Sequence, residues 1–331
     1  MTLTQLLHNA STLKIGIVGD LMLDTYWQGS VNRLSPEAPV PIVNLQKIEH
    51  RAGGSGNVAL NCQAFGAKVT LFSLIGKDEQ GLIIQEVLKS KNINIKNVLA
   101  IEHRKTTQKT RILAQHQQIT RIDYEDTEEI GQIHEKLLVK KINEYVRKER
   151  PQLFILQDYN KGVLTASLIK QVIDICNRFQ VVSIADPKIV NFFEYKHVTI
   201  FKPNLKEALN GVGIKKIPPI NLENLASIHK KIHQHLQHQI SIITLSEHGL
   251  FFQSEKQKKI IPTSALTVSD VSGAGDTVVA LVGIFYVISR NIKLSCQLAN
   301  IGAGIVCSEL GTSVINKEIF IKKAKNVLKE K

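Results

Sequence analysis

The feature that most limits the possible folds of this chain is an alternation of apolar, β-branched runs with segments of helical periodicity. The apolar runs are typical of strands buried on both faces, and they lie at residues 14–19, 69–74, 153–157, 181–185, 198–201 and 240–245. Helical spacing occurs at 57–65, 80–90, 128–148, 165–178 and 222–236, and again at 275–290, 294–308 and 317–329. This alternation predicts parallel βαβ units, and therefore an α/β fold in which helices cover both faces of a mostly parallel sheet.

Two regions interrupt the alternation. Residues 25–50 contain three prolines among short extended pieces, and residues 104–124 have the polar and apolar alternation of a hairpin. Neither region has the length or pattern of a crossover helix. We therefore expect them to form a small discontinuous β-lid beside a main domain of residues 1–24, 51–103 and 125–331. A single domain with long loops is the alternative interpretation.

The composition indicates a globular, intracellular protein. Of the 331 residues, 43% are hydrophobic, which is ample for a packed core. The four cysteines are far apart and form no CxxC pair, a pattern that favours reduced thiols in a cytoplasmic protein. There is no signal-peptide pattern, and the longest apolar run, at 278–288, is too short to cross a bilayer. We expect no membrane association.

The formal net charge of +13 is spread along the chain rather than concentrated in one patch. A basic surface of this kind attracts anionic substrates such as phosphates. Only 5% of the residues are aromatic, and they do not interleave with basic residues, so a nucleic-acid surface is not favoured. A cluster of histidines lies in a Lys- and Gln-rich amphipathic segment without cysteines or nearby acidic partners, which favours a solvated face over a metal site: His229, His233, His235 and His238.

The segment DVSGAGDT, at residues 270–277, carries the chemistry. Its three small residues, Gly273, Ala274 and Gly275, come directly before an apolar helix. Backbone amides at such a helix start can approach an anion closely, and the helix dipole adds positive potential there. The carboxylate of Asp276 lies next to this anion hole and can accept a proton from an attacking hydroxyl. A P-loop motif is absent and no GxGxxG is complete, so those nucleotide sites are not supported.

DVSGAGDT resembles the C-terminal signature of the PfkB, or ribokinase-like, carbohydrate kinases. The family's N-terminal signature is similar to the GGSGN segment at 53–57, and GDLMLD at 19–24 resembles its sugar-binding start. The NLKE segment at 204–207 matches the family's NxxE element. The resemblance extends over residues 14–311 in family order. It implies a three-layer ribokinase-like fold, ATP and Mg²⁺ as cofactors, and a sugar or sugar phosphate as substrate.

The resemblance also implies roles for individual residues. Asp276 would be the catalytic base, and the amides of Gly273, Ala274 and Gly275 would form the anion hole. Substrate contacts, including lid cations for a substrate phosphate, are expected from Asp20, Asp24, Arg33, Gly53, Gly54, Asn57, Lys109, Arg111, Arg121, Asp158 and Lys161. ATP contacts are expected from Lys188, Asn204, Glu207, Thr244, Ser246, Gly249, Gly273, Gly275 and Asn300. Glu207 would reach Mg²⁺ through water.

Within the family, five segments resemble the heptose 7-phosphate kinases of lipopolysaccharide-core precursor synthesis: RLSPEAPVP at 33–41, QDYNKG at 157–162, ADPK at 185–188, TLSE at 244–247 and LGTS at 310–313. In that branch ATP phosphorylates the anomeric 1-hydroxyl of D-glycero-β-D-manno-heptose 7-phosphate to give the 1,7-bisphosphate. The chain departs from the branch at Ser272, at Ser55–Gly56 and at Ile189, and none of these changes removes a catalytic group. It contains no HxGH nucleotidyl-transfer motif, so the resemblance implies the kinase half and a separate adenylyltransferase.

Two alternatives stay open. One is a PfkB kinase for another sugar, such as ribose or fructose 1-phosphate. The other is a non-catalytic sugar- or nucleotide-binding relative, although the complete GAGD segment argues against it. Lid strands leave exposed edges that sheets tend to cover by pairing, so we also expect a homodimer joined through the lids.

Overall fold

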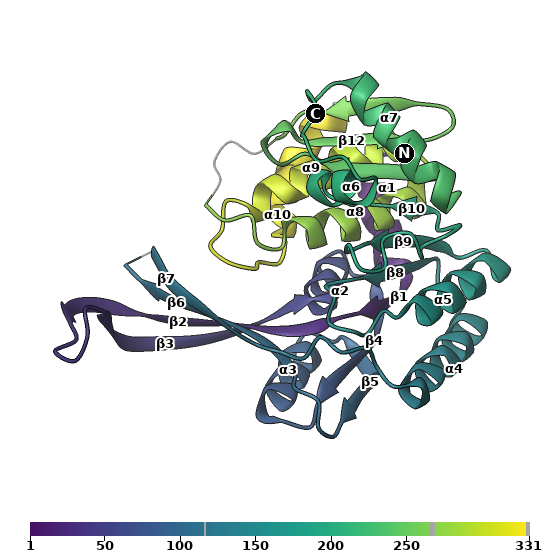
Figure 1. The fold of residues 1–331 in the computed structure, drawn as a ribbon. Coiled ribbons are helices and arrows are strands. Elements are labelled where there is room, and N and C mark those ends of the chain that lie inside the picture. The colour runs from purple at the N-terminus through teal and green to yellow at the C-terminus, as the bar shows by residue number, and fades with distance from the viewer. Residues whose placement is uncertain (116, 265–268, 329–331) are drawn as a thin grey trace.

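The computed structural model describes residues 1–115, 117–264 and 269–328, and within them the chain forms two sheets and ten α-helices (Figure 1). The strands of the large sheet are β1 (Lys14–Gly19), β4 (Lys68–Gly76), β5 (Asn94–Ile101), β8 (Leu153–Gln157), β9 (Val182–Asp186), β10 (Ile200–Phe201), β11 (Ile240–Thr244), β12 (Leu250–Gln253) and β13 (Lys258–Ile261). The small sheet contains β2 (Leu21–Leu34), β3 (Pro41–Gly54), β6 (Thr107–Ala114) and β7 (Gln117–Tyr124). The helices are α1 (Leu3–Thr12), α2 (Ser55–Ala64), α3 (Glu79–Lys89), α4 (Gln132–Glu149), α5 (Ala166–Arg178), α6 (Leu205–Gly211), α7 (Leu222–Leu236), α8 (Ala274–Ser289), α9 (Ile292–Val306) and α10 (Lys317–Leu328).

The large sheet has the order β13-β12-β11-β10-β9-β8-β1-β4-β5. Its pairs from β5 to β11 are parallel, and only β12 and β13 are antiparallel. The predicted mostly parallel sheet is therefore confirmed. The sequence analysis missed β5, β12, β13, α1 and α6, because these elements are short or partly exposed and so lack the long apolar signature of a central strand or a buried helix.

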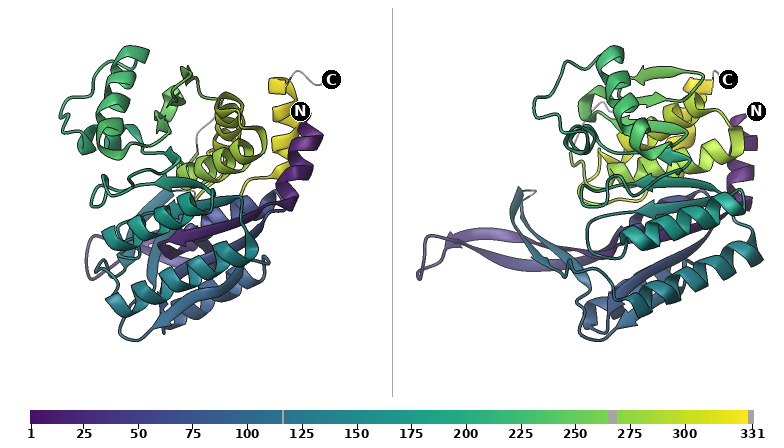
Figure 2. Two further views of the ribbon diagram at one scale, coloured as in Figure 1. Left: turned by 90° about the vertical axis from the view of Figure 1, so that its right-hand side faces the viewer. Right: turned by 45° about the vertical axis from the view of Figure 1, so that its right-hand side comes forward.

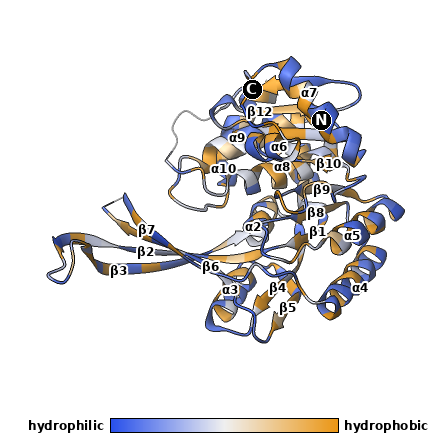
Figure 3. Ribbon diagram, in the orientation of Figure 1, coloured by the Kyte–Doolittle hydropathy of each residue, from blue (hydrophilic) through white to orange (hydrophobic). Residues whose placement is uncertain are grey.

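Helices cover both faces of the large sheet, which gives the three layers expected (Figure 2). One hydrophobic cluster joins the sheet to α1, α2, α3, α8, α9 and α10, and a second joins it to α4, α5, α6 and α7. Alternate residues of a strand enter opposite clusters: Ile17 of β1 belongs to the first and Val18 to the second. The central strands are correspondingly mostly apolar, with polar residues such as Gln157 and Asp186 at their ends (Figure 3).

The small sheet, with the order β3-β2-β6-β7, forms the β-lid. Strands β2 and β3 extend away from the main body as a long ribbon (Figure 1). The lid strands extend further toward the main domain than the predicted segment 25–50, because β2 begins at Leu21 and β3 continues to Gly54, directly before α2. The lid is thereby anchored beside the ends of the central strands.

The pairing register gives the lid two chemically different faces. Ile48, Trp27 and Ile112 are aligned across β3, β2 and β6, and their side chains share one apolar face. The neighbouring row places Glu49, Tyr26 and Arg111 on the opposite face. This second face is charged, and Tyr26 on it donates a hydrogen bond to Thr312 of the main domain at 3.2 Å.

The expectations for the cysteines and for the histidines have different outcomes. All four cysteines are buried free thiols, as predicted. No helix in the described part of the chain is both long and apolar enough to span a membrane. The solvated histidine face is wrong for His229 and His238, which are both buried against Ser241 of β11. His229 lies on the buried face of α7, and His238 lies in the short connection between α7 and β11.

Candidate active site

Asp276 lies in the first turn of α8, and its buried carboxylate accepts three hydrogen bonds. Asn57 Nδ2 of α2 donates to Oδ2 at 2.8 Å, while Gln157 Nε2 and the Tyr159 hydroxyl donate to Oδ1 at 3.0 and 2.8 Å. Burial is the main cause that raises the pKa of Asp276 to about 7, and the bonds from Asn57 and Tyr159 oppose it. A carboxyl group with this pKa can take up and release a proton near neutrality.

The loop before α8 is shaped for close approach to an anion. Gly273 has a φ of +78°, and a Cβ at this position would lie 2.7 Å from Asn57 Nδ2. The amides of Gly275 and Asp276 have no hydrogen-bond partner among the described residues, whereas the Ala274 amide donates to the Val271 carbonyl at 3.2 Å. Two free amides at the helix start are what an anion site needs, whereas the Ala274 amide, one of those predicted to form it, is engaged within its own turn.

Asp270 holds the loop before α8 in place through two hydrogen bonds. Its Oδ1 accepts a 2.8 Å hydrogen bond from the Ser272 amide, and its Oδ2 accepts a 3.0 Å bond from the Gly311 amide. The anion-hole loop is thus joined to the segment that follows α9. That segment includes Thr312, so the loop has an indirect connection to the lid.

Asp20 organises the loop that follows β8. Its carboxylate accepts hydrogen bonds from the amides of Tyr159, Lys161 and Val163 at 2.7, 3.1 and 3.1 Å, and the side chain is buried. Burial raises its pKa despite these bonds. The same loop contains Asp158, which accepts a 2.8 Å bond from Tyr195, and burial raises its pKa to about 6. In this structure Asp20 and Asp158 shape the loop that carries Tyr159.

Asp24 joins the lid to the main domain. Its carboxylate pairs with Arg111 at 2.6 Å and accepts a 2.7 Å hydrogen bond from the Thr312 hydroxyl. Gly53 lies directly beside it, since a Cβ there would be 2.4 Å from Asp24 Oδ2. The next residue, Gly54, has a φ of +57° where β3 turns into α2.

The other predicted lid cations are paired with carboxylates. Lys109 contacts Asp123 and Glu125 at 3.1 and 3.3 Å, and Lys161 shares Glu125 at 2.6 Å. Arg121 is exposed and pairs with Asp123. Arg33 is exposed near the outer end of β2, so the structure does not bring it together with the residues around Asp276.

A cavity of about 590 Å³ opens beside the start of α8. Its lining includes all the residues predicted to contact ATP except Gly273: Lys188, Asn204, Glu207, Thr244, Ser246, Gly249, Gly275 and Asn300. Asn204 caps α6 in a reciprocal capping box with Glu207, and the Glu207 carboxylate also pairs with Lys188. Asn300 donates to the Pro262 carbonyl at 2.6 Å, so its side chain also fixes the wall of the cavity.

Sequence reasoning missed several polar residues of the site. Gln157 and Asp186 end neighbouring parallel strands, and strand ends are where α/β sheets bind ligands, so their position was an available signal. Lys202 directly follows β10 and pairs with Asp186 at 3.0 Å. Nothing local in the sequence marked Lys202 as buried.

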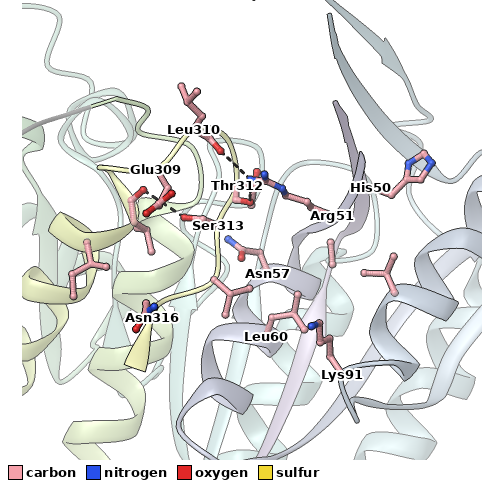
Figure 4. A pocket seen from close by; sticks show the side chains of 15 residues that line it. His50, Arg51, Asn57, Leu60, Lys91, Glu309, Leu310, Thr312, Ser313 and Asn316 are labelled. Atoms are coloured by element: carbon pink, nitrogen blue, oxygen red, sulfur yellow. Dashed lines mark hydrogen bonds between the residues drawn. The ribbon is translucent and has the colours of Figure 1, made fainter. Parts of the chain in front are cut away.

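A further cavity, of about 420 Å³, lies between the lid, α2 and the segment after α9, and Asn57 is among the residues that line it (Figure 4). Arg51 of β3 borders it and donates hydrogen bonds to the carbonyls of Leu310 and Thr312 at 2.9 and 3.0 Å. Two guanidinium groups lie near the ring of Tyr26, with Arg51 at 4.7 Å and Arg111 at 5.3 Å from its centroid. These contacts fix the root of the lid against the main domain.

The fold and the site together are those of a sugar kinase: a three-layer α/β domain with a β-lid, and a buried aspartate at a glycine-rich helix start. The chain belongs to the pfkB family of carbohydrate kinases, whose model matches residues 12–319. It is therefore an enzyme that transfers a phosphate group to a sugar hydroxyl.

Among curated proteins, the chain is similar to the "Bifunctional protein HldE" of Campylobacter curvus, with 39% identity over 307 residues, which are 93% of this chain and 64% of the relative. The protein of the same name from Geobacter sulfurreducens is 36% identical over 314 residues, or 94% of this chain and 63% of the relative. The chain thus spans less than two thirds of the length of these relatives.

Solved structures show the same fold at low identity. The phosphofructokinase-2 of Escherichia coli in complex with potassium has a TM-score of 0.78 and 14% identity, covering 96% of this chain and all of that one. The ribokinase of Arabidopsis thaliana complexed with ribose and ATP has a TM-score of 0.73 and 18% identity, covering 95% and 99%. These neighbours establish the ribokinase-like architecture.

Proposed function

We propose that this enzyme phosphorylates the anomeric 1-hydroxyl of D-glycero-β-D-manno-heptose 7-phosphate, with ATP as the donor. The observation that carries the chemistry is the buried Asp276 carboxylate beside the unpaired amides at the start of α8. The choice of substrate is supported by the heptose-kinase segments of the sequence and by similarity to proteins named HldE. The proposed use of ATP as donor and the four buried free thiols fit an enzyme of the cytoplasm.

In this proposal Asp276 accepts the proton of the 1-hydroxyl while the sugar oxygen attacks the γ-phosphorus of ATP. A new sugar O–P bond forms, the bond between the γ-phosphorus and the bridging oxygen breaks, and ADP leaves with that electron pair. The amides of Gly275 and Asp276 and the dipole of α8 stabilise the charge on the transferring phosphoryl group. The bonds from Asn57 and Tyr159 aim the carboxylate of Asp276 at the hydroxyl.

The 590 Å³ cavity is proposed to hold ATP, with its phosphates directed toward α8. Its polar wall of Asn204, Glu207 and Asp186 suits Mg²⁺, which prefers oxygen ligands. No group of three or more His, Cys, Asp or Glu side chains that could hold a metal ion exists among the described residues. Mg²⁺ commonly keeps several waters and binds substrate phosphates, and the proposal gives it that mode here. Glu207, whose two oxygens already accept bonds from Lys188 and the Asn204 amide, would contact it through water.

The sugar is proposed to bind between the lid root and the start of α2. Asp24, Gly53, Gly54 and Asn57 meet there, and Asp20 positions the adjacent loop. Lys109 and Lys161, which share Glu125, and the nearby Arg111 would face the substrate's own phosphate. Arg121, which is in register with Arg111 on β7, and Arg33, near the outer end of β2, are proposed to contribute to the same phosphate site.

We also propose that the enzyme forms a homodimer through the apolar face of the lid. Trp27, Ile48 and Ile122 are 36%, 49% and 50% exposed, which is costly for large apolar side chains in water. Pairing two lids would cover this face and the open strand edges. Sedimentation at micromolar concentration tests this proposal: a Trp27→Asp/Ile48→Asp double variant should be monomeric, and a monomeric wild type would refute it.

An ADP-release assay tests the reaction, with ATP, Mg²⁺ and heptose 7-phosphate, ribose, fructose 6-phosphate or fructose 1-phosphate. Turnover of the heptose phosphate, at least a hundredfold more efficient than that of the other sugars, is expected. Preference for another sugar would keep the kinase assignment and refute the heptose assignment. The relatives are named as bifunctional, and only sugar phosphorylation is proposed for this chain.

A further inference from the structure

Lys202 places a buried ammonium group next to the anion hole. The residue is 2% exposed and its Nζ lies 3.0 Å from Asp186 Oδ1. A Cβ built on Gly275 would be 3.8 Å from both Lys202 Nζ and Asp186 Oδ2, so the ion pair borders the first turn of α8. Both residues line the 590 Å³ cavity.

A buried ion pair at this position is not explained by stability. Removing two charges from water costs several kcal/mol for each ion, and a well-packed apolar pair is often at least as stable. Asp186 also accepts a 3.1 Å hydrogen bond from Gln157, the residue that donates to Asp276. The pair is therefore connected to the candidate base through a single side chain.

The charge of Lys202 has capacity for a ligand. Its ammonium group carries three N–H bonds, and Asp186 is its one ion-pair partner among the described residues. The other cation of the cavity, Lys188, is held by Glu207 and lies 5.3 Å from the ring centroid of Tyr159. Lys202 is thus the cation that borders Gly275 itself, where the anion hole opens into the cavity.

We propose that Lys202 is a catalytic residue that contacts the transferring γ-phosphoryl group, and that Asp186 holds the Lys202 side chain in position. This inference rests on the proposed function. Lys202 keeps its proton throughout, and its positive charge stabilises the equatorial oxygens of the phosphoryl group while the bond to ADP breaks. In a site shielded from water such a charge acts strongly, because little solvent screens it. The ADP portion of the nucleotide would not need this contact.

The test compares Lys202→Met with a matched control, Lys206→Met, in which the same substitution is made at an exposed position of α6. Calorimetry measures the affinity for Mg²⁺-ADP and for the Mg²⁺ complex of the non-hydrolysable β,γ-imido analogue of ATP. For Lys202→Met we expect about tenfold weaker binding of the analogue and less than twofold change for ADP, with kcat reduced about a hundredfold or more. Lys206→Met should match the wild type in all three.

Two further variants separate catalysis from folding. Lys202→Met leaves Asp186 buried without its partner, so Lys202→Met/Asp186→Asn should recover thermal stability but not kcat. Lys202→Arg, which keeps the charge, should recover part of kcat. Equal losses of ADP and analogue affinity, or a kcat for Lys202→Met within threefold of wild type, would overturn the proposal. If no sugar is turned over by the wild type, the proposed function fails, while the ADP and analogue affinities still decide the role of Lys202.

Discussion

Asn57 donates a 2.8 Å hydrogen bond to the carboxylate of Asp276, and this bond joins two motifs that are 219 residues apart in the chain. Asn57 lies in α2, at the root of the lid, and Asp276 begins α8. The side chain that we propose to contact the sugar therefore also orients the candidate base. Under the proposed function, this contact would couple sugar binding to proton transfer.

Asp276→Asn should abolish most of the activity, because an amide cannot accept the proton of the attacking hydroxyl. We expect kcat to fall by about 10³-fold, within the range for loss of a general base. The ADP-release assay measures this loss, and calorimetry should show unchanged affinity for Mg²⁺-ADP. A variant with more than a tenth of the wild-type kcat would exclude Asp276 as the base.

The activity should fall on the acid side of neutrality, because Asp276 has a pKa of about 7 and acts only when ionised. Below that pH, kcat/KM should decrease about tenfold per unit. Tyr159→Phe removes a hydrogen bond that lowers this pKa, so the acid limb should move to higher pH. A profile with its acid limb near pH 4 in both proteins would contradict this assignment.

Thr312→Val should loosen the lid root by removing the hydroxyl that donates to Asp24. A lost hydrogen bond to a buried charged acceptor costs about 2 kcal/mol, so the free energy of unfolding in urea should decrease by about that amount. The KM for the sugar phosphate should increase at the same time. Ser90→Ala, at an exposed helix end, is the control and should change neither quantity by a measurable amount.

The buried histidines should make the protein less stable in acid. Burial lowers the pKa of His229 to about 4 and that of His238 to about 3, so the unfolded chain takes up protons below pH 6.5 that the folded chain does not. Their penalty is absent above pH 6.5 and increases as the pH falls toward 4. His238 alone should reduce the free energy of unfolding by about 2 kcal/mol between pH 7 and pH 5.

Urea titrations at pH 7 and pH 5 measure this difference. His238→Asn should be less stable than the wild type at pH 7, because it loses packing against Phe201, but it should lose less stability between the two pH values. His8→Asn replaces a histidine of α1 and should keep the wild-type dependence on pH. An identical pH dependence for His238→Asn and the wild type would show that His238 is not the group responsible.

The sequence by itself determined the architecture and the position of the candidate base. Strands buried on both faces require apolar runs, and the glycine-rich helix start requires small residues. The sequence therefore predicted β1, β8 and the GAGD segment. The sequence also predicted the lid, because a strand with one solvent-exposed face alternates polar and apolar residues. These are local requirements, and a linear pattern records them.

Only the tertiary structure decided how the polar groups share their partners. Asp20 is satisfied by three backbone amides, and the lid cations Lys109 and Arg111 are already paired with carboxylates. The buried Lys202 also lies beside Gly275 of α8, an element that is distant in the chain. A hydrogen bond or an ion pair forms between groups that the packed fold brings within about 3 Å of each other. The spacing of residues along the chain does not indicate which groups these are.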